Sequence, residues 1–337
     1  MFTLGAYLHQ IDPYMIRLWD SPAAPIRWYG MAYLAGFVVG YLLVRRVCAV
    51  GRSTLSPKHV GDFAVALALG VILGGRLGYV VFYQPSLFFE FSGSMPWWGA
   101  LAINDGGMAS HGGIIGVILA SLIYARRHGH SWAHLLDLAA FAAPIGLFFG
   151  RVANFINGEL LGRVCSADFP LAVKFPQEMT PRFWNAAKFA QLEAALAERG
   201  IHLTGSVEQA VPALIDRIQR HDRAVIAAVE PLLSPRHPSQ LYAAALEGLV
   251  VGAVLLFAWR RPRRPLVIGA LFCITYGIVR IVDEFWRLPD DHIAHLEAAT
   301  LGISRGQWLS ALVVIAGVAL LTAARRRDAQ PMGGWMR

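Results

Sequence analysis

The chain has 337 residues, of which 56% are hydrophobic and only 15% are charged. This composition excludes an ordinary soluble globular protein and is typical of a protein that crosses a membrane several times. The formal net charge of +8 does not indicate a nucleic-acid partner, because the basic residues stand in short clusters beside apolar segments, where they serve as cytoplasmic anchors.

Seven apolar segments reach or approach the length that is needed to cross roughly 30 Å of hydrocarbon. They cover residues 28–46, 60–83, 108–125, 134–156, 240–259, 265–285 and 306–324. Every second connection is basic, and so is the tail; the basic clusters are Arg45-Arg46 with Arg52 and Lys58, Arg126-Arg127, Arg260 to Arg264, and Arg325 to Arg327. The loop 84–107 on the opposite side has no Lys or Arg. The positive-inside rule therefore predicts an N-terminus outside and a C-terminus in the cytoplasm.

The predicted fold class is all-α: a polytopic membrane protein with seven transmembrane helices and a small extracytoplasmic head. The predicted domains are an extracytoplasmic arm (1–27), helices one to four (28–162), the head (163–236), helices five to seven (237–324) and a cytoplasmic tail (325–337). In the head, residues 183–199 and 207–220 have helical apolar spacing, which predicts two short helices. Glycines at every fourth position of the second segment favour close helix packing over a binding role; they are Gly70, Gly74 and Gly78.

The unusual polar residues of the apolar segments fall near the outer membrane face in the predicted topology. A chance distribution would place them near both faces, so this arrangement predicts one site that is open to lipid and to the extracytoplasmic space. In chain order these residues are Tyr29, Arg76, the run Ser110 to Gly113 with His111, Arg151, Asn154, Glu159, the run His237 to Tyr242 with Gln240, Tyr276, Arg280, Glu284 and Arg287.

Two arginines indicate the chemistry of this site. Tyr276, Arg280 and Glu284 are spaced by four residues and share one helical face. An ion pair between Arg280 and Glu284 that only satisfies two buried charges is the alternative, but it leaves Arg151 unexplained. Arginines at the ends of two different helices, with a glycine-rich helix start that offers backbone N–H groups, predict a phosphate site. The phosphate available at that depth is a phospholipid head group.

His111 is either a structural hydrogen-bonding residue or a general base, since it stands among glycines at a helix start. His237 and Gln240 are expected to support the site, although His237 can equally shape the chain that enters the fifth helix. No Ser or Cys is placed as a nucleophile, and the three cysteines lack metal-ligand spacing. We therefore predict no metal and no other cofactor.

Seven segments of the chain resemble the prolipoprotein diacylglyceryl transferase family, and together they cover nearly its full length. They occur in the family's order, and the fourth is a nearly unbroken thirteen-residue match. The segments are Ile11-Asp12-Pro13, Arg27 to Gly30, Gly74 to Tyr79, Gly106 to Met108 with His111 to Gly113, Gly150 to Gly162, Arg236 to Tyr242, and Arg280 to Asp290.

The resemblance implies transfer of the sn-1,2-diacylglyceryl group from phosphatidylglycerol to the lipobox cysteine of a prelipoprotein, with release of glycerol phosphate. It implies an enzyme of the bacterial inner membrane whose active site faces the extracytoplasmic side. This enzyme performs the first step of lipoprotein maturation, and membrane lipids are its partners together with its two substrates. The nucleophile then belongs to the substrate, which accounts for the missing enzyme nucleophile. The implied catalytic residues are His111 as the base and Arg151 and Arg280 as the phosphate ligands; the implied substrate-binding residues are Tyr29, Arg76, Asn154, Glu159, Gly162, His237, Gln240, Tyr276 and Glu284.

The chain departs from the family pattern in two places. Ala243 stands where the family usually has Glu, which leaves Glu247 as the carboxylate of that helix, and the stretch between Gly162 and Arg236 is longer than usual. Two other classes of protein also place charged residues in apolar helices or act on phospholipids. A secondary transporter or channel for an anionic solute predicts inverted repeats and polar residues through the midplane. A metal-dependent phosphatidyl transferase predicts clustered aspartates, and neither pattern is evident in the sequence.

Overall fold

The computed structural model describes residues 5–16, 26–50, 52–93, 95–103, 106–203, 205–288 and 304–336. The chain divides into two compact units. Unit 1 consists of Met1–Val38, Pro144–Ala253 and Thr275–Ile315, and unit 2 consists of Val39–Ala143, Val254–Ile274 and Ala316–Arg337. The long helices α1 (Trp28–Ala49) and α4 (Trp132–Asn157) each contribute residues to both units.

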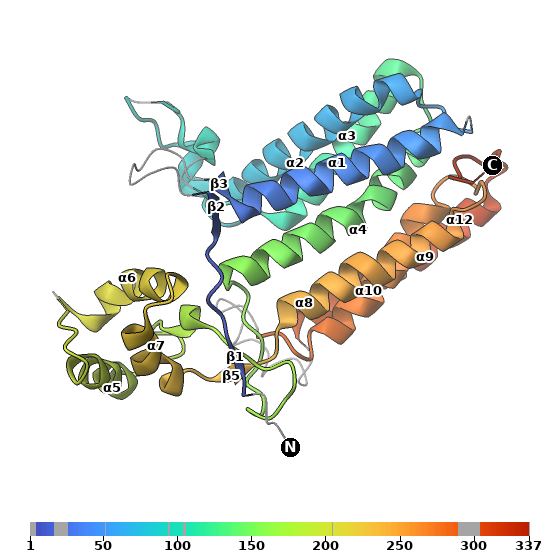
Figure 1. Cartoon of the computed structure of the whole chain (residues 1–337). Helices are drawn as coiled ribbons and strands as arrows, with labels where there is room; N and C mark the ends of the chain where they lie inside the picture. Colours follow the sequence, from blue (N-terminus) through green and yellow to red (C-terminus); the bar gives the residue numbers. More distant parts are fainter. Residues whose placement is uncertain are drawn as a thin grey trace. The chain divides into compact units, whose positions relative to one another are not determined.

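Among the described residues, five helical segments are long and apolar enough to cross a membrane. They comprise α1, α4, α2 (Val60–Phe82) with the 3-10 turn before it, α12 (Arg305–Arg326), and the continuous helix of residues 239–258 (Figure 1). The protein is therefore a mostly helical polytopic membrane protein, as the composition indicates. Its seven spans and the orientation of its termini stay predictions.

Helices also occupy the two remaining apolar segments, but they meet the spanning requirement less well. Helix α3 (Ser110–His128) starts with Ser-His-Gly-Gly and ends with Arg-Arg-His, so its apolar part is short. Helix α10 (Val267–Asp283) has 17 residues, which corresponds to about 25 Å. The segment predicted as a regular fifth helix consists of α8 (Ser239–Ala243), a π-helical turn η7 (Ala244–Val250) and α9 (Val251–Ala258).

Small strands correct the prediction of an all-α fold. In unit 1, β1 (Tyr7–Leu8) pairs in parallel with β4 (Val173–Lys174), and β4 pairs antiparallel with β5 (Pro235–Arg236). A second, two-stranded sheet joins β2 (Tyr14–Ile16) to β3 (Ile26–Arg27). Strands of two or three residues carry too little alternation to be recognised in the sequence. The pairing of β1 with β4 joins the N-terminal arm to the head, although the sequence predicts them as separate domains.

The head contains both predicted helices, α5 (Ala186–Ala197) and α6 (Val207–Gln219), and a third, α7 (Arg223–Val229) (Figure 1). Each begins at a side chain that accepts a backbone N–H bond, and these caps are Asn185, Ser206 and Asp222. Their apolar faces share one core with the arm residue Leu8; its fully buried members include Leu192, Leu196, Leu214, Ile218 and Val225. Burial of these faces, rather than helix propensity, stabilises such short helices.

Helices α2 and α3 lie side by side in unit 2 because glycines line their contact (Figure 1). A side chain at Gly70 or Gly74 would collide with the backbone of Gly116, and one at Gly78 would collide with Gly112. The predicted packing role of the second-segment glycines is confirmed. The same contact explains the glycines at the start of α3, since Gly112 faces α2 and is buried.

Candidate functional site

Arg151, near the end of α4, forms a two-pronged ion pair with Glu247 in unit 1. Its Nε and Nη2 atoms donate to the two carboxylate oxygens over 2.9 and 3.1 Å. The Glu247 side chain is fully buried and that of Arg151 is 18% exposed. A buried carboxylate without a cation would be very costly, so this pairing is required for the fold of the site as well as for any chemistry there.

The π-helical turn η7 brings Glu247 to this position. Gly248 lies against Phe148, which precedes Arg151 by about one turn of α4, and a side chain at Gly248 would collide with it. The close approach therefore puts Glu247 within reach of Arg151. Turns of this kind are rare and occur frequently at functional sites.

Arg280, on α10, contacts three carboxylates. Its Nη1 lies 2.7 Å from Glu284 and 3.2 Å from Asp283, and its Nε lies 3.6 Å from Glu247. Glu247 thus stands between the two arginines. The Arg280–Glu284 pair that the spacing predicted is present, and Glu247 supplies the partner that the sequence did not find for Arg151.

Glu284 is held from its other side by the start of α12. Ser304 donates its hydroxyl to Glu284 over 3.1 Å. The same hydroxyl accepts a hydrogen bond from the N–H of Gln307, and the Gln307 side chain accepts one from the N–H of Ser304. These two reciprocal bonds form a capping box. A carboxylate beside a helix N-terminus is also favoured by the helix dipole.

We name the group formed by Arg151, Glu247, Arg280, Asp283 and Glu284 the charged network. The network has two arginines and three carboxylates; Arg287 outside it interacts electrostatically with Asp283, and with this third arginine the sum is formally neutral. Tyr276, one turn before Arg280, interacts with Glu247 and Arg151 in the same way. Asp283 was missed as a site residue; the signal available was a second carboxylate beside Glu284 at the end of an apolar helix.

A polar turn follows α4. Glu159 accepts hydrogen bonds from the side-chain amides of Asn154 (3.0 Å) and Asn157 (3.2 Å). Gly158, with a φ of 68°, ends the helix in the left-handed conformation that favours glycine. Tyr29 contacts the hydroxyl of Tyr33 over 3.3 Å and also bonds to Asn154, so this predicted site residue reaches the turn.

Gly162, Gln240 and His237 connect this turn to the head and to α8. Gln240 is buried and donates to the backbone carbonyl of Glu159. A side chain at Gly162 would collide with the backbone of His237, so glycine is required there for close approach. His237 contacts Tyr242 over 3.4 Å. These contacts place the three residues as supports of the turn.

The buried ion pair of Arg236 and Glu178 fixes the head to the same region. The two side chains are 2.6 Å apart, and Glu178 also accepts from Trp184 and from the N–H of Ser234. Arg236 donates in addition to the carbonyl of Gly162. The head is therefore joined to the turn after α4 by a satisfied buried charge pair.

Arg76 and His111 belong to unit 2. Four hydrogen bonds from Arg76 end on backbone carbonyls of residues 99–107, so the structure gives this arginine a loop-holding role. His111 is exposed at the start of α3. An apolar pocket of about 350 Å³ adjoins it, lined in part by Ser110 and Gly113. Of the two glycines after His111, Gly112 packs on α2 and Gly113 lines the pocket.

These features define a class of protein: a polytopic membrane protein that holds a buried arginine–carboxylate network in one unit. The sequence profile of the prolipoprotein diacylglyceryl transferase family matches residues 16–323. The chain is 43% identical to phosphatidylglycerol–prolipoprotein diacylglyceryl transferase of Bdellovibrio bacteriovorus, and the alignment covers 98% of this chain and 97% of that protein. A protein of the same name from Paraburkholderia phymatum is 39% identical, and the alignment covers 94% of each chain. Another from Neisseria gonorrhoeae is 37% identical, and the alignment covers 92% of this chain and 94% of that protein. The chain belongs to the prolipoprotein diacylglyceryl transferase family.

Proposed function

We propose that the charged network of unit 1 is where this family member binds the phosphate of phosphatidylglycerol and promotes transfer of its diacylglyceryl group. Membership of the family makes the chain a diacylglyceryl transferase of lipoprotein maturation. In this proposal the acceptor of the diacylglyceryl group is the lipobox cysteine of a prelipoprotein, and the second product is glycerol phosphate.

The reaction exchanges one bond for another. The substrate sulfur attacks the diacylglyceryl carbon that carries the phosphate ester, an S–C bond forms, and the C–O bond breaks with its electron pair on the phosphate oxygen. The thiol proton passes to a base. The departing phosphate ester gains a negative charge in this step, and arginines placed around it stabilise that charge.

The observation that carries the proposal is the convergence of Arg151 and Arg280 on Glu247. Among the described contacts of the network, none uses Nη1 of Arg151 or Nη2 of Arg280. Glu247 therefore holds one edge of the Arg151 guanidinium, while Asp283 and Glu284 hold Nη1 of Arg280, and these contacts leave donors on each arginine for an anionic ligand. A planar guanidinium held in this way binds phosphate through parallel hydrogen bonds.

The remaining site residues have supporting roles in the proposal. Asn154 and Glu159 position the lipid head group, Tyr29 and Glu284 line the proposed binding site, and His111 accepts the thiol proton. A thiol with a pKa of about 8.5 is mostly protonated at neutral pH, so a base or a positive field is needed. These assignments rest on the family resemblance.

The orientation that we propose has the N-terminus outside, the C-terminus in the cytoplasm and seven spans in the bacterial inner membrane. The contacts of unit 2 support it, because the basic connections and the tail meet there. Gly333 of the tail donates to the carbonyl of Arg52 over 2.6 Å, and Arg264 donates to the carbonyl of Arg325 over 2.7 Å. Ser53 bonds the ring of His134 over 2.7 Å. Positive clusters that adjoin one another are expected on one side, the cytoplasmic one.

A direct assay tests the proposal. The purified protein is incubated with phosphatidylglycerol and a lipobox peptide, and the peptide is weighed by mass spectrometry. The expected result is a mass increase equal to one diacylglyceryl group in thioether linkage, with release of glycerol phosphate. An unmodified peptide would contradict the proposal, and uptake of an anionic solute into vesicles that contain the protein would support a transporter instead.

A further inference from the structure

One edge of strand β1, in the N-terminal arm, pairs with no other strand among the residues that the structure describes in unit 1. Strand β1 lies at the edge of the three-stranded sheet, whose order is β1-β4-β5 among the described residues. The N–H groups of Tyr7 and His9 donate to backbone carbonyls along the β4 side, each over 2.9 Å. Because the amide groups of a strand alternate in direction, those of Leu8 and Gln10 point away from β4. The outer edge of β1 can therefore pair with another extended chain.

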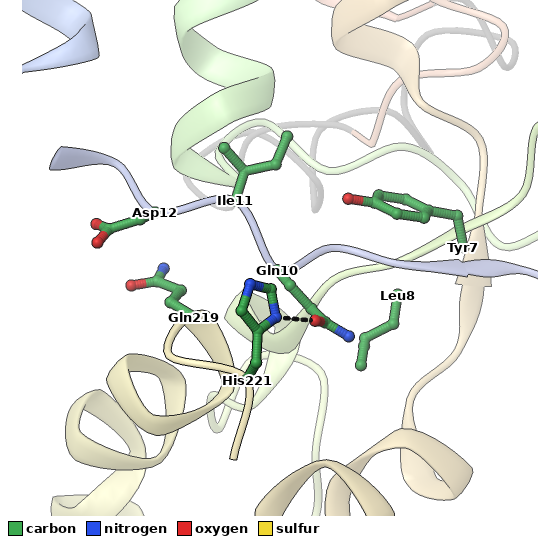
Figure 2. Close-up of a pocket in the computed structure, with 7 residues that line it drawn as sticks. All are labelled: Tyr7, Leu8, Gln10, Ile11, Asp12, Gln219 and His221. Atoms are coloured by element: carbon green, nitrogen blue, oxygen red, sulfur yellow. Dashed lines mark hydrogen bonds between the residues drawn. The ribbon is translucent and has the colours of Figure 1, made fainter. Parts of the chain in front are cut away.

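A cavity of about 540 Å³ lies beside this edge (Figure 2). Tyr7 and Leu8 both line it, although side chains of consecutive residues point to opposite faces of a strand. The cavity thus follows the edge of the strand rather than one face. Its other residues are Gln10, Ile11 and Asp12 from the arm, and Gln219 and His221 from the end of α6.

His221 and Gln10 join the two walls of this cavity. The ring Nδ1 of His221 lies 2.6 Å from the side-chain oxygen of Gln10 (Figure 2). His221 has a φ of 61° because it follows the C-cap of α6, where the left-handed conformation commonly ends a helix: its N–H donates to the carbonyl of Ile218, and the N–H of Asp222 donates to that of Arg217. The end of α6 therefore places the His221 ring in the cavity wall, where it contacts Gln10.

The edge is continuous with the charged network. The ring of His9 lies 5.3 Å from that of Phe155, which follows Arg151 by one turn of α4. On the other side of the sheet, β5 runs directly into His237 and α8. A bound peptide that extends from the charged network along the head therefore reaches β1 within a few residues, since an extended peptide advances about 3.3 Å per residue.

We propose that the outer edge of β1 binds the polypeptide substrate: the extended segment that follows the reacting cysteine adds to the sheet as a further strand. This proposal rests on the proposed function. Backbone pairing does not depend on side-chain identity, so one edge can accept prelipoproteins of many sequences. Strand β1 is short, and the segment from Tyr7 to Gln10 spans about 13 Å at about 3.3 Å per residue, which matches about four residues of a peptide.

The test uses substrate peptides that extend six residues beyond the cysteine, each with a single N-methylated backbone amide from the third of those residues onward. Methylation removes one N–H donor without changing the enzyme. We expect KM for the peptide to rise about tenfold at alternate positions and to stay unchanged between them, because only every second amide faces β1. KM for phosphatidylglycerol should not change. Uniform tolerance, or a loss without alternation, would overturn the proposal.

A photo-crosslinking amino acid at Tyr7, which is 51% exposed, gives an independent readout. The same substitution at the exposed head residue His202 is the matched control. Cross-links to the extended peptide from position 7 and none from position 202 are expected. Cross-links from position 7 to lipid or to a second copy of the chain would refute peptide binding at this edge. If the unmethylated peptide gains no diacylglyceryl group at all, the proposed function fails, and that outcome is distinct from a failure of this proposal.

Discussion

Glu247 is the carboxylate that both arginines of the charged network approach. Arg151 binds it through two hydrogen bonds of 2.9 and 3.1 Å, and Arg280 approaches it to 3.6 Å. We expect Arg151→Lys and Arg280→Lys each to lower activity by about a hundredfold or more, because an ammonium keeps the charge but lacks the planar fork. Thioether formation at equal membrane abundance is the measurement.

A matched control separates this effect from general damage. The triple variant Cys48→Ser, Cys165→Ser and Cys273→Ser should keep most of its activity, since the substrate supplies the thiol and all three cysteines are free. Near wild-type turnover in both lysine variants would remove the arginines from phosphate recognition.

His111 gives a second residue-scale prediction. Its side chain is exposed, so His111→Gln should leave membrane abundance and affinity for phosphatidylglycerol unchanged. If His111 accepts the thiol proton, transfer should slow by about 10²- to 10⁴-fold and recover in part as the pH rises toward the thiol pKa. Lower lipid affinity without rescue by pH would instead make the residue structural.

At the residue scale, the sequence predicted the arginines and the Arg280–Glu284 pair, but not the partner of Arg151. Arg151 and Arg280 are conspicuous because a charged guanidinium group is costly in an apolar helix and usually marks a functional site. Glu247 can also be recognised in the sequence as a carboxylate in an apolar helix. Its contact with Arg151 depends on how its helix is rotated about its own axis, and the π-helical turn changes that rotation locally. Arg76 shows the converse: it looks like a ligand-binding arginine in the sequence, and the structure fills its donors with backbone carbonyls.

At the scale of elements, the glycine contact between α2 and α3 leads to a prediction with a matched pair of variants. A methyl group at Gly112 would collide with the backbone of Gly74, whereas one at Gly113 would meet Val71 at an ordinary 3.8 Å. Gly112→Ala should therefore lower the free energy of unfolding by about 1–3 kcal/mol, and Gly113→Ala should change it little. Thermal unfolding in detergent checks both, and equal stability of the two variants would contradict the packing role.

The joint between the arm and the head should be sensitive to acid. His9 is buried against Phe155 and Phe175, and this burial lowers its pKa from 6.5 to about 4. The unfolded arm binds a proton more readily than the folded one, so the stability from His9 is complete above about pH 6.5 and is lost as the pH falls toward 4. The protection of residues 7–9 against hydrogen exchange, taken relative to the exchange rate of an unfolded peptide at the same pH, should therefore fall between pH 6.5 and 4.

A variant without a titrating ring is the control for this prediction. His9→Phe keeps a flat ring between Phe155 and Phe175 and should remove most of that pH dependence. An unchanged pH profile in the variant would assign the effect to another group.

The elements differ in how well the sequence predicts them. Long apolar helices and the two amphipathic head helices follow from periodicity, because burial repeats at the helical period over many residues. The strands β1, β4 and β5 do not, since two residues contain no period. The pairing of β1 with β4 joins residues more than 160 positions apart in the chain, such as Tyr7 and Val173, and only tertiary contacts determine it.

At the scale of the whole molecule, the distribution of basic residues predicts the orientation of the chain, and this prediction decides which compartment the site faces. In unit 2, contacts join the tail to the loop before α2 and to the loop before α10, through Arg52, Arg263 and Arg264. Single cysteines placed on the cysteine-free variant near Gly51, His128 and Arg263 should therefore react only after the membrane is opened. Cysteines near Ser92 and Glu208 should react with an impermeant reagent in intact cells. Labelling of the Arg263 position from outside would invert the topology and move the proposed site away from the extracytoplasmic face.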